Sequence, residues 1–130
     1  MGEIGPGADL SFQSFVGKDL RGVNLAGANL RRAILDGADL EDADLSGADL
    51  RNASMIGTNA MKAAFDGADM RGVRAMKARF GLANFQGARM DGADLRGIRG
   101  RYAVWRDANW WDAITDEGLS NALAKKWPRQ

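Results

Sequence analysis

The most restrictive feature of this 130-residue chain is a five-residue repeat that runs without a break from residue 8 to residue 112. At every fifth position from 10 to 110 stands a repeat centre, and 18 of these 21 centres are large and apolar. Ala stands two positions before 15 of them, Asp or Asn one position before 12, and Gly two positions after 11. The register never slips, so one local structure is repeated along almost the whole chain.

A period of five fits neither an α-helix nor a flat strand. On a helix, successive centres would rotate by roughly 140° and spread around the cylinder. On a strand, they would alternate between the two faces. A chain that turns the same way after each repeat places every centre in one interior, with Gly and Asp or Asn serving the turns. The pattern therefore predicts an all-β solenoid whose coils pair their backbone groups with neighbouring coils.

The pattern resembles that of the pentapeptide-repeat family in segments such as Ala28-Asn29-Leu30, Ala38-Asp39-Leu40 and Ala43-Asp44-Leu45-Ser46-Gly47. The resemblance covers about four fifths of the chain. It implies a right-handed quadrilateral (four-sided) β-helix with four repeats per coil, and the 21 repeats then give about five coils. We expect this β-helix over residues 20–112, preceded over residues 1–19 by an N-terminal cap or incomplete first coil.

Where a centre is small, its inner partner two positions earlier is larger, as in Thr58 with Ala60, Val73 with Ala75 and Ile98 with Gly100. Compensation of this kind is expected in a close-packed core. Near the start, Gln13 and Lys18 stand at inward positions, and Lys18 can extend its ammonium group outward.

Residues 113–130 leave the repeat and predict a C-terminal helix. Thr115 is expected as its N-cap, and Ile114 and Leu119 as a hydrophobic staple. This helix either covers the last coil or pairs two copies of the chain, and both roles are compatible; in this family, pairing through the C-terminal end is common. The residues expected at this cap or dimer seam are Trp105, Trp110, Trp111, Leu119, Leu123 and Trp127.

The composition argues against an enzyme. The chain contains no Cys and no His, which removes thiol nucleophiles and the commonest general base and metal ligand. The recurring Asp residues and the glycine spacing belong to the repeat, and no phosphate-binding motif follows any glycine. We therefore expect no catalytic residues, no cofactor and no metal site. The first residues lack a secretion signal and no apolar run approaches a membrane span, so we expect a cytoplasmic protein with no membrane partner.

Function must then lie on the outer surface. Four apolar residues at outward positions form a candidate interaction patch for an unidentified protein partner: Ile34, Ile56, Met61 and Met76. Arg31, Arg51 and Arg71 would stack as a ladder with Asp49 and Asp69 beside them, a pattern more typical of a solvated surface than of a binding site.

Charge is uneven along the chain. Residues 1–65 hold 6 Lys or Arg against 9 Asp or Glu, whereas residues 66–130 hold 12 against 8. The candidate basic patch consists of Arg74, Lys77, Arg79, Arg96, Arg99 and Arg101. Only Tyr102 could stack on a base nearby, so a nucleic-acid partner is disfavoured relative to a solvated basic surface.

The leading hypothesis is a non-catalytic bacterial protein that acts as an interaction or scaffold module. The alternative implied by the family resemblance is a DNA-mimicking modulator of DNA gyrase or topoisomerase. Mimicry requires a strongly negative rod, and both the net charge of +1 and the absence of a loop that breaks the register disfavour it.

Overall fold

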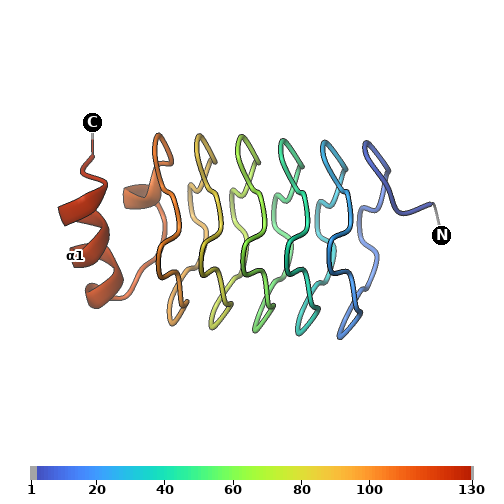
Figure 1. The fold of residues 1–130 in the computed structure, drawn as a ribbon, viewed down its shortest axis with the longest axis horizontal. Coiled ribbons are helices and arrows are strands. Elements are labelled where there is room, and N and C mark those ends of the chain that lie inside the picture. Colours follow the sequence, from blue (N-terminus) through green and yellow to red (C-terminus); the bar gives the residue numbers. More distant parts are fainter. Residues whose placement is uncertain (1–2, 130) are drawn as a thin grey trace.

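Each repeat is bonded to the repeats twenty residues before and after it. The computed structural model describes residues 3–129, and its seventeen isolated bridges are all parallel and all join residues twenty positions apart, from Asp9 with Asn29 to Asp94 with Ile114. Four five-residue repeats therefore make one coil. Within residues 3–129 the bridges stay isolated and form no longer strand, because a turn follows every centre. The coils stack into the rod of a β-solenoid (Figure 1).

Every turn depends on one residue in the left-handed backbone region. The second residue of each turn has a φ between +56° and +73° at all 21 positions from 7 to 107, and twelve of these residues are Gly. In eleven repeats the Asp or Asn before the centre accepts a hydrogen bond from the amide two residues later, as Asp44 does from Ser46 at 2.9 Å. The expected use of Gly and of Asp or Asn in the turns is confirmed.

The centres and their inner partners fill the rod. All centres from Leu10 to Leu95 are buried, and so are Thr58 and Val73, which compensate for small centres. The Thr58 hydroxyl donates to the Leu35 carbonyl at 2.7 Å, so its burial leaves no unmet donor. In the later coils the interior becomes aromatic, with the Phe65 and Phe85 rings stacked at 5.2 Å between centroids.

The coil begins earlier than residue 20, the expected start of the β-helix. Asp9 already bridges to Asn29, and Leu10 and Phe15 are buried. Lys18 is exposed, in keeping with its outward extension. Gln13 is half-buried, and its side-chain oxygen is buried without a hydrogen-bond partner.

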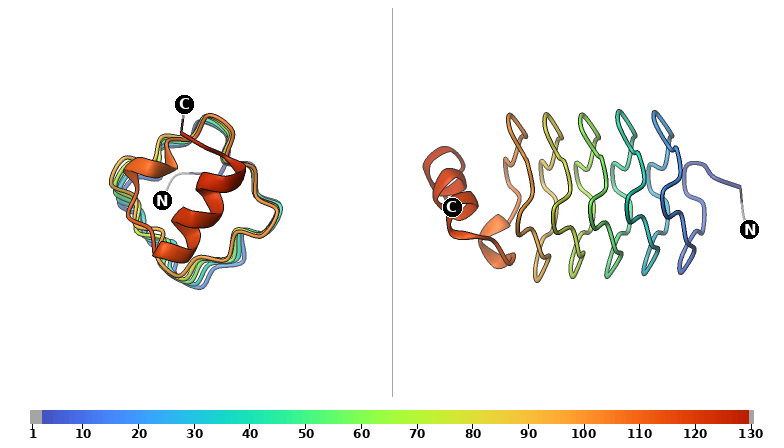
Figure 2. Two further views of the ribbon diagram at one scale, coloured as in Figure 1. Left: turned by 90° about the vertical axis from the view of Figure 1, so that its left-hand side faces the viewer. Right: turned by 90° about the horizontal axis from the view of Figure 1, so that it is seen from below.

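Two helices follow the last full coil: η1, a 3-10 helix over Trp110–Asp112, and α1 over Glu117–Lys126. Viewed along the rod, α1 lies across the end of the superimposed coils (Figure 2), and Leu123 packs into the core. The predicted N-cap Thr115 is wrong, because Asp116 occupies that position and accepts from the Leu119 amide. Ile114 also departs from its predicted role in a hydrophobic staple, because it bridges to Asp94 in the coil and is 48% exposed.

Candidate functional site

Because each coil spans twenty residues, residues twenty apart lie above one another on the same side of the rod. Three sides of the rod are named here as faces, each defined by its residues. The ladder face comprises residues 8–12, 28–32, 48–52, 68–72 and 88–92; the isoleucine face 13–17, 33–37, 53–57, 73–77 and 93–97; and the polarised face 18–22, 38–42, 58–62, 78–82 and 98–102.

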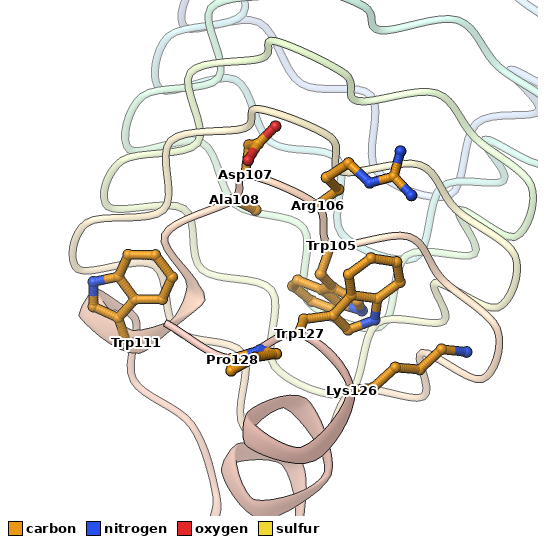
Figure 3. Close-up of a pocket in the computed structure, with 8 residues that line it drawn as sticks. All are labelled: Trp105, Arg106, Asp107, Ala108, Trp111, Lys126, Trp127 and Pro128. Atoms are coloured by element: carbon orange, nitrogen blue, oxygen red, sulfur yellow. The ribbon is translucent and has the colours of Figure 1, made fainter. Parts of the chain in front are cut away.

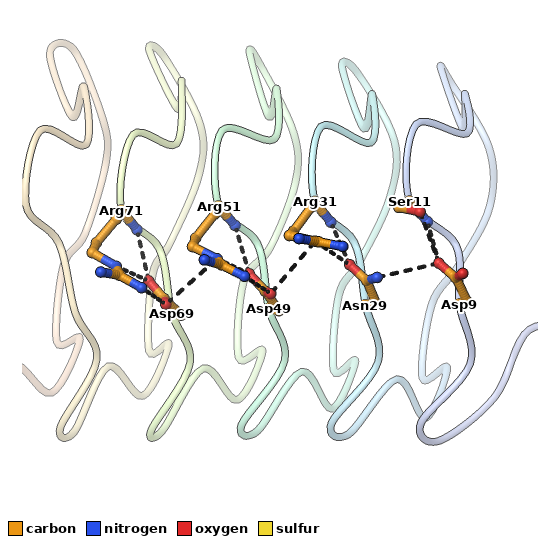
Figure 4. A network of polar contacts seen from close by, with 8 residues as sticks. All are labelled: Asp9, Ser11, Asn29, Arg31, Asp49, Arg51, Asp69 and Arg71. Carbon is orange, nitrogen blue, oxygen red and sulfur yellow. Dashed lines mark hydrogen bonds and ion pairs between the residues drawn. The ribbon is translucent and has the colours of Figure 1, made fainter.

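The ladder face holds the predicted stack of arginines (Figure 4). Arg51 makes a two-pronged bond to Asp49, at 2.9 Å from Nε and 2.8 Å from Nη2, and its Nε lies 3.8 Å from Asp69 of the next coil. Arg71 binds Asp69 in the same way. The hydrogen bond from Arg51 lowers the pKa of Asp49, and that from Arg71 lowers the pKa of Asp69. Arg31, Arg51 and Arg71 are thus each paired with a carboxylate, and these residues form a structural charge ladder.

The isoleucine face brings the two predicted patches together. Ile34 is 38% exposed, and the half-buried Ile56 and Met76 lie above one another because they are twenty residues apart. Lys77 follows Met76, and Arg96 lies one coil further along the same column. Arg74 and Lys77 make no ion pair among residues 3–129, whereas Arg96 is bound to Asp94 at 2.6 Å. The face therefore changes from apolar in the middle coils to basic in the later ones, without a loop between.

The remaining members of both predicted patches lie on the polarised face. Met61 is half-buried there, and its sulfur lies 3.3 Å from Nη2 of Arg79. Arg79 bridges to Arg99, and both are exposed together with Arg101. Neither the apolar patch nor the basic patch is therefore confined to one face.

The prediction missed three exposed apolar residues that stand in the left-handed turn position. Phe12, Leu82 and Tyr102 are 70%, 52% and 68% exposed, and their φ values are 63°, 59° and 62°. The signal was present in the sequence, because each stands where the repeat usually has Gly, and a side chain in that position cannot enter the core.

At the C-terminal end, the last coil and α1 enclose a cleft (Figure 3). Its volume is about 240 Å³, and the indoles of Trp105, Trp111 and Trp127 line it together with Lys126 and Arg106. Trp110 points inward, and its Nε1 donates to the Trp127 carbonyl at 2.7 Å. Of the six predicted seam residues, Trp105, Trp110 and Leu123 are buried, and the other three are half-buried and packed against the core.

No cluster of three or more acidic residues in residues 3–129 is arranged to hold a metal ion. No helix in the same range is both long and apolar enough to cross a membrane.

Known proteins resemble the chain in sequence pattern and in fold. A family model described as pentapeptide repeats matches in eight copies, over residues 7–42, 38–74, 72–99 and 78–109. None of the curated proteins matches the chain. Among solved structures, the chain is similar to HetL, a pentapeptide repeat protein involved in heterocyst differentiation regulation from the cyanobacterium Nostoc sp. strain PCC 7120, with 29% identity and a TM-score of 0.65. The match covers 87% of this chain, which spans only 57% of the HetL chain.

Two further structures have the same kind of fold. A pentapeptide repeat protein from the Arabidopsis thaliana thylakoid lumen is 24% identical, with a TM-score of 0.62 over 94% of this chain and 78% of its own. A second pentapeptide repeat protein from Nostoc PCC 7120 is 28% identical, with a TM-score of 0.58 over 85% of this chain and 78% of its own.

Proposed function

This chain belongs to the pentapeptide-repeat family, and from that premise we propose that it is a non-catalytic scaffold that binds a protein partner on the isoleucine face. The proposal rests on one observation. Arg74 and Lys77, which make no ion pair within residues 3–129, lie beside the apolar side chains Ile56 and Met76 on a side of the rod that no loop of the described residues covers.

This combination is typical of protein interfaces. Met and Arg are enriched at such surfaces, where apolar contacts provide the buried centre and charges the rim. On the ladder face, by contrast, Arg51 and Arg71 are already bound to Asp49 and Asp69. HetL, which is similar over most of this chain, is involved in the regulation of heterocyst differentiation, and a regulatory role of this kind is compatible with the proposed partner binding.

The test is affinity capture from native lysate with the wild-type chain and with Ile56→Asp/Met76→Asp. We expect the double variant to lose a partner that the wild type retains, because two carboxylates then stand in the apolar contact. Ala26→Asp/Gln86→Asp, on the side that bears neither patch, is the matched control and should retain it. Equal capture by all three proteins would refute the assignment to the isoleucine face.

We further propose that the coil is right-handed and four-sided, as the family resemblance implies, and that α1 acts as the cap of its last coil. Burial of Leu123 and the Trp110–Trp127 hydrogen bond support the capping role. Pairing of two chains through this end is the second role proposed for the helix, with Trp111, Leu119 and Trp127 as the half-buried residues available for it.

A DNA-mimicking role is less well supported by the charges. The exposed cations Arg79, Arg99 and Arg101 lie on one side of the later coils, where a DNA mimic would need negative charge. A gyrase supercoiling assay with and without a quinolone discriminates between the roles. We expect no effect of excess protein, and rescue of gyrase from the quinolone would favour mimicry.

A further inference from the structure

The second and fifth coils of the polarised face carry opposite charges, whereas its first coil holds Lys18, Asp19 and Arg21. On the second coil stand Asp39, Glu41 and Asp42, and on the fifth coil stand Arg99 and Arg101. Glu41 and Asp42 lie within 4.0 Å of no cation, and Arg99 and Arg101 within 4.0 Å of no carboxylate, among residues 3–129. Glu41, Asp42, Arg99 and Arg101 thus remain unneutralised by ion pairs within residues 3–129, whereas Asp39 lies 3.8 Å from Arg21 of the first coil.

Between these coils the polarised face carries the apolar side chains of Met61 and Leu82 together with the exposed cations Lys62 and Arg79. Met61 reaches across Gly81, and its methyl carbon would lie 3.6 Å from a Cβ placed there. Leu82 is 52% exposed beside them, and Tyr102 is exposed at the basic end. Met, Tyr and Arg are enriched at protein–protein interfaces, and all three residue types occur on this face.

The order of these groups is self-complementary. Consider a two-fold axis that lies in the plane of contact, runs perpendicular to the rod and passes between the third and fourth coils. This axis relates two rods that lie antiparallel, face to face. It places the second coil of each copy opposite the fifth coil of the other, and the third opposite the fourth. Asp39 then faces Arg99 of the second copy, and Glu41 faces Arg101 of the second copy. Because the axis is two-fold, each of these pairs occurs twice.

At the centre of this arrangement the third coil of each copy meets the fourth coil of the other. Met61 of one copy meets the Met61–Gly81 surface of the second copy, and Asp42 faces the Tyr102 hydroxyl of the second copy. The parallel bridges that join Asp39, Asn59, Arg79 and Arg99 keep this column in register through all four coils. No loop has to move for the two faces to meet.

We propose that two copies of this chain pair antiparallel through the polarised face. The inference goes beyond the proposed partner binding and does not depend on it, because it uses a different side of the rod. Four coils at about 4.8 Å each give a contact only about 19 Å tall. The interface is therefore at the small end of the known range, and its charge pairs are sensitive to salt.

Sedimentation velocity with charge-reversed variants tests the pairing. The acid-reversed variant is Glu41→Lys/Asp42→Lys, and the base-reversed variant is Arg99→Glu/Arg101→Glu. Each alone sets like charges against each other, so we expect the dimer dissociation constant to rise at least about tenfold. Mixed in equal amounts, the two variants should dimerise more tightly than either variant alone, because the charges introduced at positions 41 and 101 then attract each other. Asp39 opposite the reversed charge at position 99 should keep the mixture weaker than the wild type.

Arg32→Glu/Arg74→Glu makes the same change of net charge as the base-reversed variant but on other sides of the rod, and it should leave the dimer intact. Circular dichroism melts establish that every variant is folded. A wild type that stays monomeric at low salt, or a mixture that dimerises no more tightly than either variant alone, would overturn the proposal. A dimer that is indifferent to both reversals would also overturn it and would favour pairing through the C-terminal end.

Discussion

At the scale of single residues, the turn position decides how much strain each repeat stores. A left-handed backbone costs a residue with a Cβ about 1–2 kcal/mol, and nine of the 21 turns hold such a residue. Asn52, Asp42 and Asp107 tolerate this region better than other side chains do. Leu82 and Tyr102 have no such advantage, so the native fold holds them at a local cost.

Replacing Leu82 by Gly should therefore stabilise the protein. The strain relieved exceeds the extra entropy that Gly loses on folding, and we expect a gain of about 0.5–1 kcal/mol. Urea denaturation measures it directly. The reciprocal change, Gly47→Ala, meets no steric obstacle but keeps a φ of 65°, and should destabilise by a similar amount. A stability loss in Leu82→Gly would show that the exposed leucine makes contacts that outweigh its strain.

At the scale of the elements, the Asp-x-Arg turns combine a backbone and a side-chain function. Asp94 accepts from the Arg96 amide at 3.2 Å and from the Arg96 guanidinium at 2.9 and 2.6 Å. The bond from the Arg96 side chain lowers the pKa of Asp94 below its ordinary value of 3.8. The turns at Asp49 and Asp69 have the same lowered pKa for the same reason.

These turns predict how stability depends on pH. Because the folded pKa values of Asp49, Asp69 and Asp94 are lower than those of the unfolded chain, the unfolded chain binds protons first as the pH falls. Their stabilising contribution is complete well above pH 3.8, the ordinary value, and is lost as the pH falls through the lower folded values. Urea denaturation at about pH 6 and about pH 3 should show this loss.

The variant Asp49→Asn/Asp69→Asn should be less stable at neutral pH and should lose less stability on acidification. Asp107→Asn removes a carboxylate that makes no ion pair within residues 3–129, and it should behave like the wild type. An acid loss that is equally large in all three proteins would mean that other carboxylates control it.

At the junction between the last coil and α1, side-chain oxygens accept the backbone amide hydrogen bonds that carbonyl groups of a further coil would otherwise accept. Along the rod, the Gly87 amide donates to the carbonyl nineteen residues later. At the end, the Gly97 amide instead donates to a carboxylate oxygen of Asp116, at 2.8 Å, and the Met90 amide donates to the side-chain oxygen of Asn109, at 2.6 Å. The other Asp116 oxygen accepts from Leu119 and starts α1.

Asp116→Ala should therefore cost more than an ordinary helix cap. It removes the cap bond of α1 and leaves the Gly97 amide without its acceptor, for a total of about 1–2 kcal/mol. Thr115→Ala should change stability by less than about 0.5 kcal/mol. Urea denaturation followed by tryptophan fluorescence reports on this end, where Trp110 and Trp127 lie. Equal losses in the two variants would contradict the assignment of Asp116 as the cap.

At the scale of the whole molecule, the sequence predicts the interior far better than the ends or the faces. Leu45 and Thr58 could be placed inside because an unbroken repeat gives each position one environment. Asp116 could not be chosen over Thr115, because its second bond reaches Gly97, far away in the sequence. The patch residues were identified one by one, but the contiguity of Met76 and Arg96 depends on the twenty-residue coil, which the five-residue period alone does not give.

Because the coils stack in one dimension, the position of a core substitution should determine how much of the rod unfolds. Each coil contacts only its neighbours, so a terminal coil can detach while a central coil cannot. Leu10 and Leu45 are both fully buried, and a buried carboxylate without a partner costs several kcal/mol at either position. Leu45→Asp should therefore unfold the whole rod, whereas Leu10→Asp should release only the first coil.

Hydrogen exchange followed by mass spectrometry distinguishes these outcomes. In Leu10→Asp, amides of residues 30–110 should keep their protection while those before residue 20 lose it. In Leu45→Asp, protection should be lost throughout, and in the volume-conserving control Leu45→Met it should persist, at a cost below about 1.5 kcal/mol. If Leu10→Asp lost protection along its whole length, the coils would fold as one cooperative unit, and stability could not be divided among neighbouring layers.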